Sequence, residues 1–238
     1  MTIAVFSGPT LWNDPVRGAA GFTWLPPARR GDVLRAARRR PFAIGLIDGC
    51  FETVPSVWHK EILWALANGV HVFGAASLGA LRAAELAPFG MRGVGRVFLQ
   101  YADGTLERDD EVAVLHAPAE LGFRPVTEAL VDMRATLALA VAQGALDRPS
   151  GRRLAAVAAA MFFKDRTWSE VLARAGGRFG RFRRWLKTNR AEVKRADARA
   201  MVDELRAFAA ATRAPFAARG LDFRDTSLWQ QMVVEEAL

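Results

Sequence analysis

Three apolar runs bounded by glycine or proline fill much of the first 90 residues and constrain the fold more than any other feature. They are IAVFSG (3–8), PFAIGLIDG (41–49) and VHVFGA (70–75). Stretches of helical composition separate or follow them at 31–40, 56–67 and 77–86. Alternating strands and helices favour a parallel sheet covered by helices. We therefore predict an α/β fold, with a small parallel sheet and flanking helices in the N-terminal half.

The second half of the chain has a different pattern. Segments 126–143, 150–163, 167–176 and 194–214 show helical spacing with few strand-like runs. We expect two regions: an α/β core over 1–122, and a mostly helical region over 123–238 that packs on it. A further strand is expected at 112–115. The aromatic residues of the tail after Pro215 suggest that it docks on the protein: Phe216, Phe223 and Trp229.

Charge and cysteine content narrow the classes of function. The net charge is +8, and residues 164–213 alone carry 14 Lys/Arg against 6 Asp/Glu. Such a stretch can bind nucleic acid, a membrane surface or an acidic protein, but solvated helix faces are the simpler explanation. No zinc-finger or basic-zipper pattern accompanies it. No apolar run has the length of a membrane span, and the first residues lack the basic start and long apolar stretch that a signal peptide would show. We expect a cytoplasmic protein without membrane or nucleic-acid partners. Cys50 is the single cysteine, which excludes an intrachain disulfide.

Ser77 lies where a buried strand is expected to turn into a helix, among glycines and alanines. A serine at such a turn projects beyond the carboxyl end of the sheet, where open α/β folds bind ligands. Amides at the start of the helix could stabilise an oxyanion. The segment resembles a nucleophile elbow, with Ala75 at the first glycine position. The alternative is that Ser77 only caps the helix and that the small residues allow close packing.

Lys60 is the basic residue that could serve this serine, since the chain has only three histidines. Its neighbours on the helical wheel are Val57, Leu63 and Trp64, so its surroundings should be apolar. Partial burial disfavours the ammonium form and lowers the pKa, as a lysine base requires. The alternative is a lysine whose stem covers apolar surface while its amine stays in water.

Other chemistries find weaker support in the sequence. Ser77, Asp109 or Asp110, and His116 follow the order of an α/β-hydrolase triad, but the acid and the histidine would share one short segment. Cys50 is a possible thiol nucleophile, although a buried thiol is commoner. Residues 109–111 could bind a divalent cation, although three acids in a turn are usually solvated. GVG at 93–95 lacks the full dinucleotide-binding pattern. We predict no cofactor and no metal.

Long strings of the N-terminal half resemble TfuA-like proteins. They are VFSGPTL (5–11), IDGCFETVPSVWHKEILWAL (47–66), GVHVFGAASLGALRAAEL (69–86), FGMRGVGRVF (89–98) and DDEVAVLHAPAE (109–120). The resemblance implies a Ser–Lys pair, and Ser77 and Lys60 stand at the matching positions. Leu78 replaces a methionine that is common in the family, a change that conserves volume.

The resemblance also implies a function. TfuA-like proteins act beside YcaO enzymes, which use ATP to activate a peptide amide and exchange its oxygen for sulfur. The implied activity is hydrolysis of the C-terminal thiocarboxylate of a ThiS-like sulfur-carrier protein, which releases sulfide for YcaO to install in a precursor peptide or protein.

In this mechanism neutral Lys60 takes the proton of Ser77, which attacks the thiocarboxylate carbon. Amides at Gly8, Leu78 and Gly79 are the expected oxyanion and substrate-binding groups, and Arg82 is expected to attract the anionic substrate. The rival interpretation is an adaptor without catalysis, which recruits substrate to YcaO through its basic helical half. A nucleic-acid-binding protein is a third interpretation that rests on charge alone.

Overall fold

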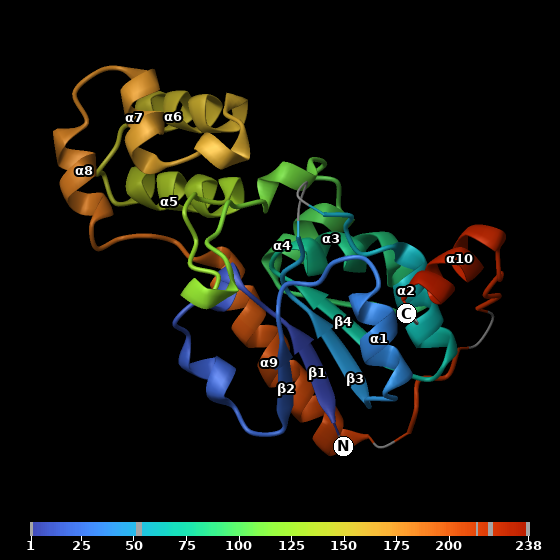
Figure 1. The fold of residues 1–238 in the computed structure, drawn as a ribbon. Helices are drawn as coiled ribbons and strands as arrows, with labels where there is room; N and C mark the ends of the chain where they lie inside the picture. Colours follow the sequence, from blue (N-terminus) through green and yellow to red (C-terminus); the bar gives the residue numbers. More distant parts are fainter. Residues whose placement is uncertain (1, 51–53, 213, 219–220, 237–238) are drawn as a thin grey trace.

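A five-stranded sheet forms the centre of the molecule. The computed structural model describes residues 2–50, 54–212, 214–218 and 221–236. All strand pairs are parallel, in the order β2-β1-β3-β4-β5 (Figure 1). The strands are β1 (Ile3–Phe6), β2 (Phe22–Leu25), β3 (Ala43–Leu46), β4 (His71–Ala75) and β5 (Arg92–Val94). This confirms the predicted fold class. Edge strands β2 and β5 were not predicted, because both are short and largely lack fully buried residues.

The three central strands are buried on both faces. In β1, Ala4 and Phe6 belong to the core on one face of the sheet, and Ile3 and Val5 belong to the core on the other. This alternation follows from the two-residue period of a strand. A sheet covered on both sides accounts for the continuous apolar runs of the sequence.

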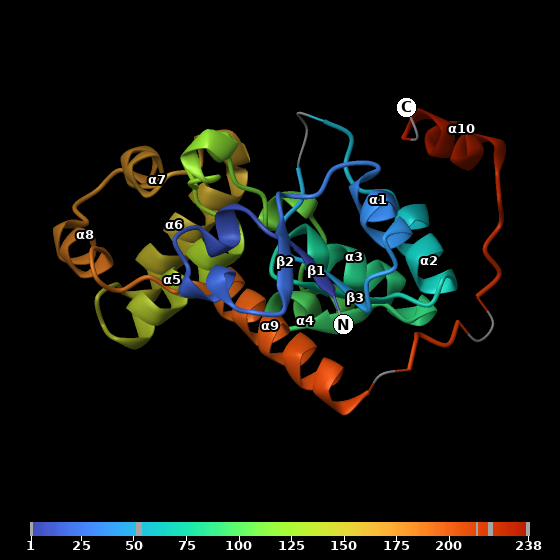
Figure 2. The same ribbon diagram turned by 60° about the horizontal axis from the view of Figure 1, so that its bottom comes forward.

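Helices from opposite ends of the chain cover the two faces. One face carries α1 (Asp32–Arg38), α2 (His59–Ala67) and α3 (Leu78–Leu86), while α9 (Val193–Ala211) crosses the other face (Figures 1 and 2). Ala198, Met201, Val202 and Leu205 of α9 are all buried. Gly45 of β3 leaves the space that α9 occupies, since a Cβ there would lie 2.9 Å from Leu205.

Other helices of the second half form a separate cluster beside the sheet. They are α5 (Leu130–Ala142), α6 (Arg148–Ala160), α7 (Trp168–Ala175) and α8 (Gly180–Leu186), and they share a core of their own (Figure 2). Helix α4 (Arg96–Ala102) packs beside α3 and α9. The mostly helical second half is therefore confirmed, although α8 was not among the expected segments. Short 3₁₀ helices occupy Pro9–Leu11, Pro15–Gly18, Ala87–Phe89, Asp109–Glu111, Ala119–Leu121 and Phe163–Asp165.

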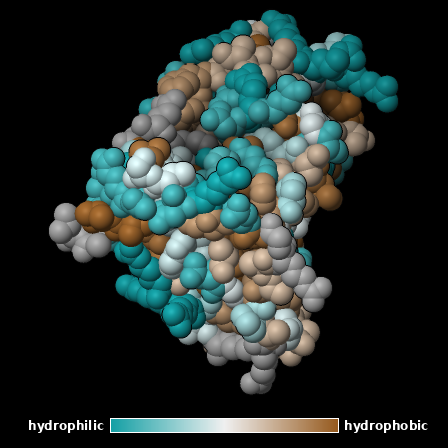
Figure 3. Space-filling model, turned by 90° about the vertical axis from the view of Figure 1, so that its right-hand side faces the viewer, coloured by the Kyte–Doolittle hydropathy of each residue, from teal (hydrophilic) through white to brown (hydrophobic). Residues whose placement is uncertain are grey.

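Two local expectations have opposite outcomes. The strand expected at 112–115 is wrong, because this segment leaves a 3₁₀ helix and runs irregularly to a single antiparallel bridge between His116 and Pro125. The tail does dock, as predicted: the helix α10 (Ser227–Glu235) buries Trp229 and Met232 against Leu34. Figure 3 shows the face on this side of the molecule, where hydrophilic surface is interrupted by small, separate apolar areas.

Candidate functional site

The turn between β4 and α3 holds Ser77 in an unusual backbone geometry. Ala76 has a φ of 65°, a left-handed value that is uncommon for a residue with a side chain and costs free energy. Ser77 N–H donates back to Ala75 O at 2.7 Å, which closes the turn. Ser77 occupies the position of an N-cap, but its hydroxyl caps no amide of α3. The alternative that Ser77 serves only as a capping side chain therefore does not describe its contacts.

Glycines allow α3 to start directly on the sheet. A Cβ at Gly79 would lie 1.7 Å from Leu46 O, and a Cβ at Gly74 would lie 2.1 Å from Gly79 O. Gly79 N–H donates to Ile47 O at 3.2 Å. Close packing is therefore a real role of these small residues, and it places Ser77 at the carboxyl ends of β3 and β4.

A buried lysine lies beside Ser77, and it is Lys194 of α9. Lys194 Nζ donates to Val112 O at 2.6 Å, and Ser77 Oγ lies 3.5 Å from the same oxygen. Both side chains are buried, with 4% and 3% of their surface exposed. Burial lowers the pKa of Lys194, although the carboxylates of Asp48 and Asp132 act in the opposite direction.

Sequence reasoning missed Lys194 because it lies in the basic stretch, far from Ser77 along the chain. One signal was present. Lys194 begins the apolar stripe of α9 that continues through Ala198, Met201 and Leu205, at the spacing of one helix face. A lysine on the buried face of a helix is rare and worth noting from sequence alone.

Asp48 is the buried carboxylate of the site. It follows β3, is 1% exposed, and accepts hydrogen bonds from Gly8 N at 2.8 Å and Thr10 N at 3.1 Å. The Thr10 hydroxyl donates to its other oxygen at 2.6 Å. The amide of Gly8, expected to bind an oxyanion, is thus already used by Asp48. These bonds tie the loop after β1 to the end of β3.

The expected contact between Lys60 and Ser77 is absent from the hydrogen bonds of the described residues. Lys60 Nζ donates instead to Arg224 O and to Thr226 Oγ1, both at 2.7 Å, and lies 5.6 Å from the centre of the Phe223 ring. The reason is the tail, which supplies these acceptors on the side of α2 that carries Lys60. A catalytic role for Lys60 therefore remains a prediction without a contact to support it.

Arg82 and Leu78 line an open cleft of 840 Å³ that also includes Glu85, Asp109 and Ala113. We call it the acidic cleft, because four carboxylates and two arginines line it. Arg82 donates to Glu85 Oε2 at 2.7 Å and to Val57 O at 3.2 Å. Its charge is therefore largely compensated, which weakens its expected role in attracting an anion.

A second cleft, of 320 Å³, lies where the helical cluster meets the sheet. Its lining includes Lys194 and Thr10, and four basic residues outnumber three acidic ones, so we call it the basic cleft. Burial raises the pKa of one of those acids, Asp132, to about 6, so this carboxyl group loses its charge below that pH. An anionic substrate therefore fits the basic cleft better than the acidic one.

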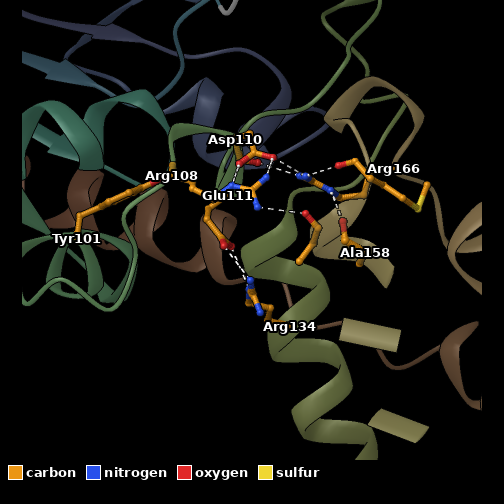
Figure 4. Close-up of polar contacts among 9 residues, drawn as sticks. Tyr101, Arg108, Asp110, Glu111, Arg134, Ala158 and Arg166 are labelled. Carbon is orange, nitrogen blue, oxygen red and sulfur yellow. Dashed lines mark hydrogen bonds and ion pairs between the residues drawn. The ribbon is translucent and has the colours of Figure 1, made fainter. Parts of the chain in front are cut away.

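Val112 lies between these clefts, since Ala113 lines one and Val114 lines the other. Arg166, which is fully buried, donates to Asp110 Oδ2 at 2.7 Å and to Asp110 O at 2.8 Å (Figure 4). Its remaining hydrogen bonds reach Ala158 O and Met161 O in and after α6. Arg166 therefore fastens the segment before Val112 to the helical cluster.

The other acid of this segment is held as well. Glu111 accepts two hydrogen bonds from Arg134 of α5, at 2.9 and 3.1 Å (Figure 4). Although burial acts against ionisation, the hydrogen bonds from Arg108 and Arg166 lower the pKa of Asp110. The expectation of a solvated acidic turn is wrong for these two residues. No group of three or more potential metal ligands occurs within the described residues.

The weaker alternatives gain no support. His116 Nδ1 contacts Ala117 O at 2.8 Å, and its ring packs against Phe123, so it does not complete a triad with Ser77. Burial raises the pKa of the Cys50 thiol, which disfavours a reactive thiolate. No helix in the described part of the chain is both long and apolar enough to cross a membrane.

Comparison with known families gives one match. The family model described as TfuA-like protein matches residues 48–167. The chain belongs to the TfuA-like family. No protein with a curated description matches it. The family is associated with YcaO enzymes, which points to a role in the YcaO-associated thioamidation system and to a protein partner. The matched segment includes Asp48, Ser77 and Arg166, but not Lys194.

Proposed function

We propose that this TfuA-like protein hydrolyses the C-terminal thiocarboxylate of a ThiS-like sulfur-carrier protein. The released sulfide serves a YcaO enzyme, which places sulfur in the backbone of a precursor peptide or protein. The observation that carries the proposal is the position of Ser77, on a strained turn at the carboxyl ends of central parallel strands and beside a buried amine.

Ser77 is the nucleophile in this proposal. Its oxygen attacks the thiocarboxylate carbon, and the negative charge that develops on the acyl oxygen lies near the start of α3. The first amides of a helix lack intrahelical acceptors and carry the positive end of the helix dipole. The amide of Gly8 already donates to Asp48, and the amide of Gly79 already donates to Ile47 O. Of the three amides expected to bind the oxyanion, that of Leu78 therefore suits it best.

The test incubates the purified protein with a thiocarboxylated carrier and without YcaO. We expect mass spectrometry to show sulfur replaced by oxygen in the carrier, together with release of sulfide. Ser77→Ala should lower the rate by at least about 10²-fold, because removing a nucleophile removes the covalent route. Ser169→Ala, on α7 in the helical cluster, should keep the parent rate. An unchanged rate in Ser77→Ala would show that Ser77 is not the nucleophile.

The rival function is an adaptor, and one observation favours it. Ser77 is buried in this structure, whereas the basic residues around α8 are exposed: Arg178, Arg181, Arg183, Arg184 and Lys187. An adaptor would bind YcaO or the carrier through this basic surface and leave the thiocarboxylate intact. The same assay separates the two functions, since an adaptor increases sulfur transfer only when YcaO is present.

A further inference from the structure

An exposed loop forms one wall of the basic cleft. Ala117 N–H donates to Arg124 O, and Val126 N–H donates to Leu115 O, both at 2.8 Å, so the chain folds back on itself between them. The returning arm lines the cleft with Arg124, Pro125 and Val126. We call residues 117–126 the cleft loop.

Arg124 of the cleft loop is a positioned cation that no carboxylate neutralises. Its guanidinium carbon lies 5.7 Å from the centre of the Trp12 ring, a contact in which the aromatic face attracts the positive charge. Two other arginines of the cleft are paired with carboxylates, at 2.7 Å for Arg190 and 3.0 Å for Arg195. Among the residues that the structure describes, Arg124 has no such ion pair. Its hydrogen-bond donors are therefore available to an anion.

The cleft loop also exposes large apolar side chains. Leu121 at its tip is 65% exposed, and Val126 at the rim of the cleft is 56% exposed. A single exposed leucine is common on a protein surface. Here two apolar side chains share one short loop with an arginine that lies over a tryptophan ring. Apolar, aromatic and arginine side chains together are typical of protein–protein interfaces.

The dimensions of the basic cleft suit the end of a chain. Its volume of 320 Å³ is at the lower end of the range for small ligands, roughly 300–1,000 Å³. The cleft also leads toward Ser77, because its lining includes Lys194, which contacts the same Val112 oxygen as Ser77. On the other side of Val112, the acidic cleft has four carboxylates against two arginines and repels an anionic chain end.

We propose that the basic cleft and the cleft loop are the docking site for the sulfur-carrier protein. The anionic end of the carrier's C-terminal chain enters the cleft beside Arg124, and the folded body of the carrier rests on Leu121 and Val126. The inference rests on the hydrolytic function proposed above for the identity of this ligand. It assigns the residues that bind and orient the ligand.

The first experiment measures binding by isothermal titration calorimetry, with a ThiS-like carrier that ends in its ordinary carboxylate. This carrier is the product of the proposed reaction, so binding is measured without turnover. A second carrier ends in a C-terminal amide, which removes the charge. We expect the amide form to bind about 10–100-fold more weakly, because a hydrogen bond to a charged group usually contributes that much.

Arg124→Gln tests which residue meets that charge. We expect it to weaken binding of the carboxylate form about 10-fold and to leave binding of the amide form nearly unchanged, because the two groups interact directly. Arg181→Gln on α8 is the matched control, since it removes the same charge at another exposed site and should affect neither form. Equal losses for both forms in Arg124→Gln, or an equal loss in Arg181→Gln, would overturn the anion site.

Leu121→Ser tests the contact with the body of the carrier. We expect binding of both carrier forms to weaken about fivefold, because an apolar side chain no longer becomes buried. Leu99→Ser on α4 is the control, since Leu99 is 60% exposed and lies outside the cleft loop. Circular dichroism and thermal melting should show that both variants fold like the parent. Equal binding by the two variants would show that the carrier does not rest on the cleft loop.

The sulfide assay separates docking from chemistry. Arg124→Gln should raise KM and leave kcat unchanged, because Arg124 binds the carrier equally in the ground state and the transition state. If the carrier binds as described and no sulfide is released, the docking site stands and the hydrolytic function fails. If Arg124→Gln releases sulfide with the parent KM, the docking site is wrong and the hydrolytic function stands. Binding of RNA or of anionic lipid vesicles, without binding of the carrier, would also overturn the docking site.

Discussion

Ala76 and Ser77 show how a single turn can carry a functional signal. The left-handed φ of Ala76 costs free energy of order 1 kcal/mol or more, and tight packing around Gly74 and Gly79 keeps the turn in place. Capping of α3 does not explain this strained backbone, because the Ser77 hydroxyl makes no capping hydrogen bond. The geometry therefore favours a functional role for the hydroxyl.

The raised pKa of the buried Asp132 carboxyl group can be tested through the pH dependence of stability. Its folded-state pKa of about 6 lies above its usual value of 3.8. The folded protein thus binds this proton more tightly than the unfolded chain, and the stability that the proton provides is lost as pH rises from about 4 to about 6. Asp132→Asn should therefore be more stable than the parent above pH 6, by about 1–3 kcal/mol.

The measurement is the free energy of unfolding in urea at several pH values between 4 and 8. The amide oxygen of Asn can still accept the Lys194 N–H, which donates to Asp132 Oδ1 at 3.1 Å. Asp203→Asn, at an exposed site, is the control and should change stability by less than about 0.5 kcal/mol. A stability difference that does not grow with pH would show that Asp132 is ionised in the folded protein at every pH tested.

At the scale of elements, the link between the helical cluster and the sheet depends on Arg166. Its guanidinium satisfies the carboxylate of Asp110 and three backbone carbonyls without exposure to solvent. Replacing one partner of a buried pair leaves the other without compensation. We expect Arg166→Met to lower the free energy of unfolding by about 3–5 kcal/mol.

This variant should also loosen the segment that ends at Val112, because Arg166 fixes it to α6. Amide hydrogen exchange at 108–113 should become faster while exchange in β1, β3 and β4 stays slow. Arg174→Met removes only an exposed ion pair with Glu170 and should cost less than about 1 kcal/mol. Equal losses for the two variants would mean that Arg166 is not the main link.

At the scale of the whole molecule, α9 completes the sheet that the N-terminal half begins. A chain ending at residue 122 would leave Ile3, Val5 and Phe73 without the helix that covers them. Each such side chain contributes about 2 kcal/mol when buried. We expect residues 1–122 to show no cooperative unfolding transition by circular dichroism, although the sequence suggested that they form a core of their own.

A chain ending at residue 217 is the matched comparison. It lacks α10 but keeps α9, so it should unfold cooperatively with a lower Tm, because Leu34 and Trp58 lose their cover. Cooperative unfolding of the 1–122 chain would show that the sheet is stable without α9.

The sequence by itself determined the central strands, the flanking helices and the place of Ser77, because these depend on local periodicity and on turn residues. Edge strands β2 and β5 escaped prediction, since strands of three or four residues with little burial carry weak signals. The partners of Ser77 escaped as well. Only the tertiary structure decided that Lys194 of α9 lies near Ser77 at the carboxyl ends of the central strands. It also decided that Lys60 forms hydrogen bonds to the C-terminal tail. Contacts between distant segments follow from how faces pack, and the spacing of residues along the chain does not encode them.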